Sequence, residues 1–248
     1  MSPNTTLFLL ATALAAASLH AAVPDGPLLA VPGKVIYENA LVAKPEEPWK
    51  AAKGKWTPSE GALRGAELPE DNHGAVLRMT GPVADNVIIE YQFRFLDDAK
   101  TTSLSVNGTK DHVCRLLMTP KTFTVQKDDN DHEGPDKAVV FSRQAADLAP
   151  EVWHTVRLEI IGDQMLGQCD DMVGFGANEL ITKPKMNMGF TVGGQSVEFR
   201  ALKISEATLN PKWETVKASL PAGKPAPAPA APKGKGKGAA KKKAAAAN

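Results

Sequence analysis

The central part of the chain alternates hydrophobic and polar residues with a period of two. Residues 86–95 read Asn-Val-Ile-Ile-Glu-Tyr-Gln-Phe-Arg-Phe, with a hydrophobic residue at every odd position from 89 onward and a polar residue at every even position from 90 onward. Because successive side chains of a strand point to opposite faces, this pattern predicts a strand with one buried face. Residues 153–161 and 196–204 follow the same pattern, and a change of parity around Ala201 predicts a β-bulge there.

Shorter hydrophobic segments separated by turn residues predict further strands. Pairs such as Asn107-Gly108 and Gly193-Gly194 supply the turns. The segments are residues 34–37, 62–65, 75–79, 102–106, 112–118, 122–127, 139–141, 165–169 and 188–192. Two short helices are predicted, at residues 143–148 and 211–218. So many short strands in about 200 residues predict an all-β fold, an antiparallel two-sheet jelly-roll sandwich.

The two ends of the chain differ in composition from this central part. Residues 1–22 contain an apolar run from Leu7 to Ala17 and end in Ala21 and Ala22, which predicts a secretory signal peptide and a secreted or periplasmic protein. Residues 221–248 consist of Ala, Lys, Pro and Gly with one Asn, which predicts a disordered tail. The folded domain is therefore expected to span residues 23–220. No apolar run reaches the roughly 18 residues that a membrane-spanning helix needs.

The net charge of +1 conceals two parts of opposite charge. Residues 1–220 carry 22 basic and 28 acidic residues, whereas residues 221–248 carry seven lysines and no acid. A flexible basic segment attracts polyanions, and more strongly at low salt. Because the expected export argues against nucleic acid as the partner, we expect the tail either to contact anionic polysaccharide or to act as a solubilising end without a partner.

Several short segments occur together in an order that resembles a known family. They are Gly54-Lys55-Trp56 with residues 60–63, residues 86–95, residues 153–159 with Gly162-Asp163, and Gly189-Phe190 with residues 197–200. The set resembles the concanavalin A-like lectin/glucanase jelly roll, and most closely the 3-keto-disaccharide hydrolase domain of exported bacterial proteins. The resemblance covers roughly residues 35–207 and rests on structural positions, so it implies a fold more directly than a chemistry.

Three functions are compatible with this resemblance. The first is an exported protein that binds carbohydrate, such as cell-envelope polysaccharide. The second is a hydrolase or lyase of 3-keto-disaccharides. Its first residues to test as acid, base or oxyanion partners would be His112, Arg115, Glu90 and Glu159. The third is a non-catalytic structural envelope protein. The sequence lacks the paired strand carboxylates of laminarinase-type glucanases and the Asn-Ser-Gly motif of the 3-keto-disaccharide hydrolases, which favours the binding protein.

Alternation also gathers charged and amide side chains on one predicted sheet face. In lectin-like sandwiches such a face holds sugar hydroxyls, so we take it as the candidate binding site. The candidate residues are Glu90, Gln92, Arg94, Arg115, Arg157 and Glu159, with Glu198 and Arg200 beside them. The alternative is a solvated face with cross-strand ion pairs, each worth roughly 0.2–1 kcal/mol.

The sequence predicts neither a metal site nor a cofactor. Residues 127–137 form the densest acidic stretch, but as a calcium-binding EF-hand loop they would place Val140 where a bidentate Glu is required. The five histidines lack the spacing that puts two ligands on one helix face. Two cysteines cannot supply a cysteine-rich zinc site, and Cys114 and Cys169 are expected either to form a disulfide or to remain buried thiols.

Overall fold

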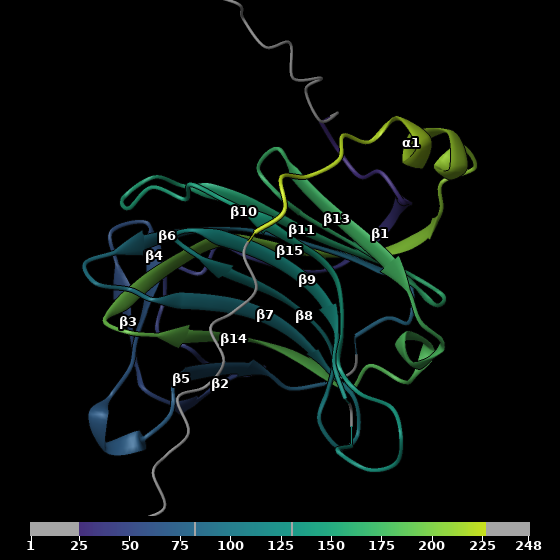
Figure 1. Cartoon of the computed structure of the whole chain (residues 1–248). Coiled ribbons are helices and arrows are strands. Elements are labelled where there is room, and N and C mark those ends of the chain that lie inside the picture. The colour runs from purple at the N-terminus through teal and green to yellow at the C-terminus, as the bar shows by residue number, and fades with distance from the viewer. Residues whose placement is uncertain (1–24, 82, 130, 227–248) are drawn as a thin grey trace, which may run out of the picture.

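The structure is a computed structural model that describes residues 25–81, 83–129 and 131–226. The predicted signal peptide at residues 1–22 lies outside the described residues, as does the predicted tail from residue 227 onward. In the described part the chain forms fifteen β-strands, one α-helix and two short 3₁₀ helices (Figure 1). The strands form two antiparallel sheets that pack face to face, which confirms the predicted all-β sandwich. No helix among these residues is long and apolar enough to cross a membrane.

Sheet A has the strand order β13-β12-β11-β6-β15-β4-β3, with β1 paired to β15 outside this path. Its strands are β1 (Ala30–Asn39), β3 (Lys55–Ser59), β4 (Ala62–Ala66), β6 (Val87–Leu96), β11 (His154–Ile161), β12 (Gln164–Cys169), β13 (Met172–Ala177) and β15 (Ser196–Leu209). The register of β15 against β6 shifts between Arg200 and Lys203, and Ala201 there has a φ of 53°. The predicted β-bulge is therefore confirmed.

Sheet B has the strand order β10-β9-β8-β7-β14-β5-β2. Its strands are β2 (Trp49–Lys53), β5 (Ala75–Met79), β7 (Thr101–Asn107), β8 (His112–Thr119), β9 (Thr122–Lys127), β10 (Val139–Ala145) and β14 (Asn187–Gly193). The helices lie outside both sheets: α1 (Trp213–Ser219) and the 3₁₀ helices Pro69–Asp71 and Glu179–Thr182.

Aromatic side chains connect the two sheets across the core. Phe190 lies on β14 of sheet B, and Phe199 and Tyr91 lie on sheet A. The ring centroid of Phe190 is 4.6 Å from that of Phe199 and 4.8 Å from that of Tyr91. Trp49 of β2 stacks on the same Phe190 ring at 5.8 Å. Each of these side chains is buried. Burying one Phe stabilises the fold by roughly 1.5–3 kcal/mol. The burial of these side chains therefore fixes which alternate residues of the central strands lie in the interior.

A second, smaller core lies on the outer face of sheet A. Leu28 and Leu29, which precede β1, and Trp213 of α1 pack there against hydrophobic side chains of β6, β12 and β13. Beneath this cover, the Glu159 carboxylate accepts hydrogen bonds from the backbone N–H groups of Leu28, at 2.9 Å, and Ala30, at 2.7 Å. The buried carboxylate thereby fixes the entry of the chain into β1.

Each strand that alternation predicts is present, but the pattern misses β2, β3 and β13. In β2, four of the five residues are exposed, so the strand has no alternation to detect. The helix predicted at residues 211–218 is present as α1, whereas the helix predicted at residues 143–148 is wrong. Arg143 to Ala145 continue β10 and pair with β9, because sheet pairing outweighs the local helix propensity of these residues.

The last described residues add to the edge of sheet B. The Ala145 N–H donates to the Lys224 carbonyl oxygen at 2.8 Å, and the Ala226 N–H donates to the Arg143 carbonyl oxygen at 3.0 Å. Pro225 consequently lies opposite Gln144. The segment predicted as a tail therefore begins with a short ordered stretch that covers part of the β10 edge.

Replacing Glu159 by Ala is expected to lower the free energy of unfolding by about 2–3 kcal/mol, because buried N–H groups lose their acceptor. Chemical denaturation followed by tryptophan fluorescence measures this change. Glu206→Ala is the control, because Glu206 is an exposed residue of β15, and a change within about 0.5 kcal/mol is expected for it. Equal effects of the two substitutions would contradict a fixing role for Glu159.

Candidate functional site

The structure distributes the six candidate residues over both sheets. Arg115 lies on β8 of sheet B. The other five, Glu90, Gln92, Arg94, Arg157 and Glu159, lie on β6 and β11 and share the outer face of sheet A. Since the core separates the two sheets, the six residues do not form one site. Glu159 is in addition fully buried beneath the N-terminal segment.

Several charged residues of sheet A pair with one another. The carboxylate of Glu198, which is buried, forms ion pairs with Arg64 at 2.9 Å and with Arg94 at 2.6 Å. Trp153 lies against the same group, with the guanidinium carbons of Arg200 and Arg94 at 3.9 Å and 4.7 Å from its ring centroid. These contacts hold each arginine in place on the sheet.

Arg157 and Gln92 are engaged in the same way. The Arg157 guanidinium donates to the Glu90 carboxylate at 2.8 Å and to the Gln168 side-chain oxygen at 2.9 Å. The side-chain oxygen of Gln92 accepts a hydrogen bond from Arg200 at 2.7 Å. The outer face of sheet A therefore carries cross-strand ion pairs. This arrangement is the alternative to a sugar-binding site that the sequence left open.

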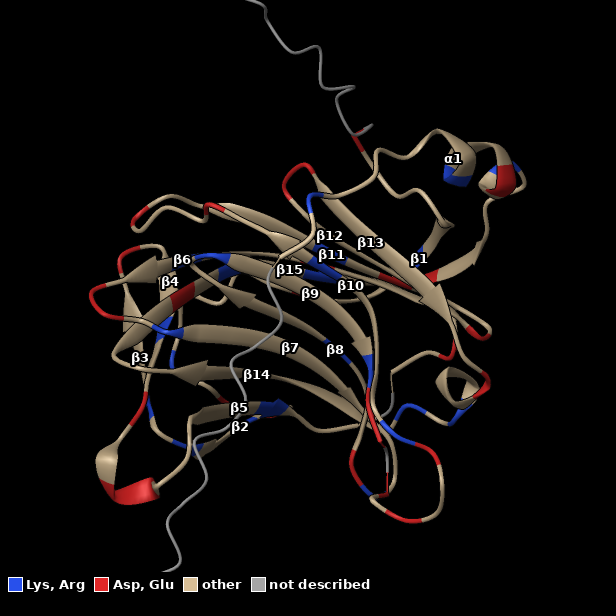
Figure 2. Ribbon diagram, in the orientation of Figure 1, with Lys and Arg blue, Asp and Glu red and all other residues tan. Residues whose placement is uncertain are grey.

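A row of side chains crosses the outer face of sheet B. It consists of Lys50, Arg78, Gly189, Ser105, Arg115 and Gln126, at paired positions on β2, β5, β14, β7, β8 and β9. Neighbours along these strands, such as Leu77 and Leu104, lie in the core, so the row points away from it. Figure 2 shows basic positions on β5 and β8. With adjacent strands about 4.8 Å apart, the row spans roughly 24 Å.

Arg115 is held rigidly in this row. Its Nε and Nη2 atoms each donate to the Asp128 carboxylate, both at 3.0 Å. The Gln126 side-chain amide donates to the same carboxylate at 2.7 Å. This bidentate geometry fixes the plane of the guanidinium and leaves its remaining N–H groups free to bind another acceptor.

A histidine lies on the same face, next to this row. His112 Nδ1 contacts the side-chain oxygen of Asn107, and the Asn107 amide donates to Asn187 at 2.6 Å. Because the Asn107 oxygen can only accept, His112 Nδ1 carries the proton and Nε2 has none in the neutral ring. Burial, together with the positive charges of Arg115 and Arg78, lowers the pKa of His112 below its usual value. The imidazole is therefore neutral at pH 7.

Three polar groups in the row lack a partner in the described part of the chain. The Ser105 hydroxyl is buried and forms no hydrogen bond. Arg78 and Lys50 are exposed, and neither forms a hydrogen bond or ion pair with a described residue. Between Arg78 and Ser105 stands Gly189, where a Cβ atom would lie 2.6 Å from the Leu77 carbonyl oxygen. No side chain therefore separates these two polar groups.

Sequence reasoning missed Arg78, Lys50 and Ser105. Alternation within residues 75–79 and 102–106 contained a usable signal, because it separates Arg78 and Ser105 from the hydrophobic positions beside them. It does not say which strands are neighbours, so it could not bring these residues together with Arg115.

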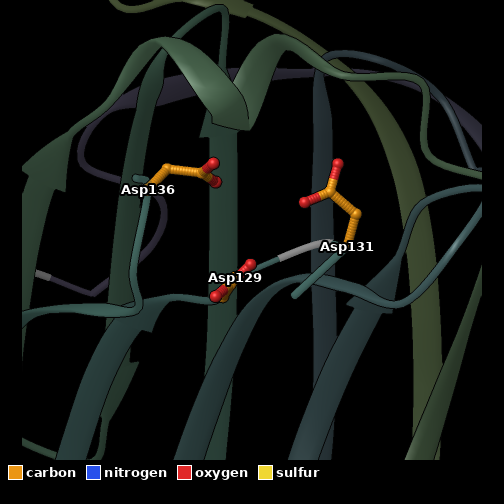
Figure 3. Close-up of side chains that lie close together, drawn as sticks. All are labelled: Asp129, Asp131 and Asp136. Carbon is orange, nitrogen blue, oxygen red and sulfur yellow. The ribbon is translucent and has the colours of Figure 1, made fainter. Parts of the chain in front are cut away.

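The acidic stretch forms a loop between β9 and β10. The carboxylates of Asp129, Asp131 and Asp136 lie within 4.8 Å of one another (Figure 3). Each of them has a lysine at 3.5–3.7 Å: Lys137, Lys110 and Lys127, respectively. These ion pairs account for the arrangement, which fits a solvated loop better than a metal site.

The two cysteines are buried free thiols, so of the two alternatives the disulfide is not formed. Cys114 lies on β8 and Cys169 on β12, in different sheets. Burial raises the pKa of Cys114 to about 12 and raises the pKa of Cys169 as well. Both thiols stay protonated at neutral pH and are poor nucleophiles.

A pocket of about 940 Å³ opens where the edges of the two sheets meet. It is lined by the end of β10, the turn between β12 and β13, and residues 221–224. Of the six candidate residues only Arg157 reaches it, and its other charged groups include Asp147, Asp170 and Asp171. The acidic lining distinguishes this pocket from the basic row on sheet B.

No protein-family model matches the chain, and no curated protein is significantly similar to it in sequence. The carbohydrate-binding module CBM66 from Bacillus subtilis has a TM-score of 0.51 at 13% identity, covering 64% of this chain and 96% of that chain. A Bacillus subtilis protein of unknown function with a galectin-like fold has a TM-score of 0.55 at 12% identity, covering 73% of this chain and all of that chain. At such identities the likeness shows the fold alone. That fold is the concanavalin A-like or galectin-like sandwich that the resemblance implies.

Replacing Arg78 by Gln is expected to raise the pKa of His112, because one of the positive charges that disfavour the imidazolium is removed. The negative charges of Asp111 and Asp128, which favour the imidazolium, remain. An NMR titration of the imidazole signals measures the shift. Because the folded-state pKa of His112 is depressed, its contribution to stability is present above the unfolded-state pKa and is lost as pH falls. An unchanged pKa in the variant would contradict the proximity of Arg78.

Proposed function

We propose that this protein binds carbohydrate through the outer face of sheet B, in the row from Gly189 to Gln126. The observation that carries the proposal is the Ser105 hydroxyl, which is buried without a hydrogen-bond partner. Leaving such a group unpaired costs about 1–3 kcal/mol. The hydroxyl oxygen has almost no accessible surface in the unliganded chain, so a sugar hydroxyl reaches it only after neighbouring side chains shift. Binding then recovers a cost that folding leaves in place.

The groups around Ser105 suit the same ligand. Arg115 pairs with Ser105 across the strands and keeps free N–H groups after binding Asp128. The Asn107 and Asn187 amides lie on the same face, fixed by their mutual hydrogen bond. Groups that are already held in one geometry lose little entropy on binding, which favours recognition of a polar ligand.

The comparison by fold supports the proposal without assigning a ligand. A structure of this fold is described as a carbohydrate-binding module, so the sandwich is a scaffold on which sugar binding occurs. We further propose that the protein is exported, as residues 1–22 predict, and that the basic segment after Ala226 is available to contact anionic polysaccharide.

The alternative of a 3-keto-disaccharide hydrolase or lyase is less well supported. Of its first residues to test, His112 and Arg115 share the outer face of sheet B. Glu90 and Glu159 lie on the opposite sheet, where Arg157 and backbone N–H groups engage them. These two carboxylates therefore cannot act together with His112 on one bound sugar.

Replacing Ser105 by Ala is expected to weaken sugar binding roughly fivefold, the equivalent of one hydrogen bond of about 1 kcal/mol. The same substitution should leave the melting temperature unchanged or raise it, because it removes an unpaired buried hydroxyl. A glycan array identifies the best-bound sugar, and calorimetry with that sugar compares the variant with the original protein.

The matched control is Ser103→Ala, on the same strand and facing the same side, opposite Leu117. It should change the affinity less than twofold. Binding that Ser105→Ala leaves intact would rule out this site. Absence of binding to every glycan tested would remove the function itself and favour a structural role.

A further inference from the structure

The row on sheet B carries an excess of positive charge in a part of the chain that is otherwise acidic. Residues 1–220 hold 22 basic and 28 acidic residues. The row nevertheless contains Lys50, Arg78 and Arg115, and Asp128 is the carboxylate that binds one of them. The positive charge is concentrated on β5 and β2, at the end of the row away from Asp128.

Arg78 differs from every other arginine in the described residues. Arg64, Arg94, Arg115 and Arg157 pair with carboxylates, and Arg143 and Arg200 form hydrogen bonds with side chains. Arg78 forms neither kind of contact with a described residue, although it lies in the middle of a strand between two paired neighbours. The strand register places it on the same face as His112, whose pKa its positive charge lowers.

The spacing of these groups fits one small ligand. Arg78 and Ser105 occupy paired positions on either side of Gly189, about 10 Å apart at the backbone. Gly189 places no side chain between them. A guanidinium that reaches inward over the glycine could bind one end of a sugar unit whose other end faces Ser105.

We propose that the ligand of this face is an anionic saccharide, whose carboxylate or sulfate group binds Arg78 with Lys50 beside it. The proposal rests on the proposed function and names the class of sugar. A planar guanidinium binds either anion through two parallel N–H···O hydrogen bonds. On binding, the anionic group of the ligand becomes the partner that Arg78 lacks among the described residues.

The test compares matched polymers that differ in charge. Alginate, polygalacturonate and hyaluronan are each measured beside their carboxyl-reduced neutral counterparts, and dextran sulfate beside dextran. The full-length protein is used with Lys233, Lys235, Lys237, Lys241, Lys242 and Lys243 replaced by Gln, so that the basic tail does not contribute. At least one anionic polymer is expected to bind roughly tenfold more tightly than its neutral partner.

Two variants assign this preference to a residue. Arg78→Gln should reduce the ratio of anionic to neutral affinity to near one. Lys55→Gln should preserve the ratio, because it removes one charge from an exposed position on β3 of sheet A. Circular dichroism and the melting temperature show that both variants fold.

The outcomes separate this inference from the proposed function. Neutral polymers that bind as tightly as their anionic partners would overturn the inference and leave carbohydrate binding standing. An unchanged ratio in Arg78→Gln, or equal competition by double-stranded DNA, would also overturn it. No binding to any polymer would remove both.

Discussion

The aromatic contact between the sheets is the constraint on which the rest of the structure depends. Phe190 of sheet B packs against Phe199 and Tyr91 of sheet A, and this contact fixes which face of each central strand turns inward. Because side chains alternate along a strand, every position between the aromatic ones must then point outward. Two outer faces result, one on each side of the molecule, and their side chains cannot meet through the core.

The two outer faces solve the problem of exposed charge differently. On sheet A, residues of neighbouring strands pair with each other, and the N-terminal segment with α1 covers the remainder. On sheet B, Arg115 is fixed by Asp128, whereas Ser105 and Arg78 keep unused hydrogen-bonding capacity. A face that already satisfies itself gains little from a ligand. Groups with unused hydrogen-bonding capacity beside a glycine give a ligand something to bind.

The sequence predicts the fold well because alternation is a property of single strands. Residues 86–95 show it without the rest of the chain, and even the bulge at Ala201 appears as a change of parity. The edge strand β2 carries no such signal, because four of its five residues are exposed, and it is missed. The sequence also predicts a helix at Arg143, whereas in the structure this residue belongs to β10 and pairs with β9.

The candidate site is harder to predict, because it depends on which strands lie side by side. Arg115 and Glu90 both occupy polar positions of alternating strands, and nothing in that pattern says that they belong to different sheets. Likewise, the grouping of Arg78, Gly189 and Ser105 comes from the order β5-β14-β7, which joins segments far apart in the chain. The lack of a partner for Ser105 is a property of packing alone.

The most direct test of this account is a map of amide NMR shifts during titration with a bound saccharide, since it locates the ligand without any substitution. We expect the largest changes at Arg78, Gly189, Ser105 and Arg115, on adjacent strands of sheet B, with small changes on β6 and β11. Changes centred instead on Glu90, Gln92 and Arg94 would show that sugar binds the self-paired face of sheet A and would contradict the account.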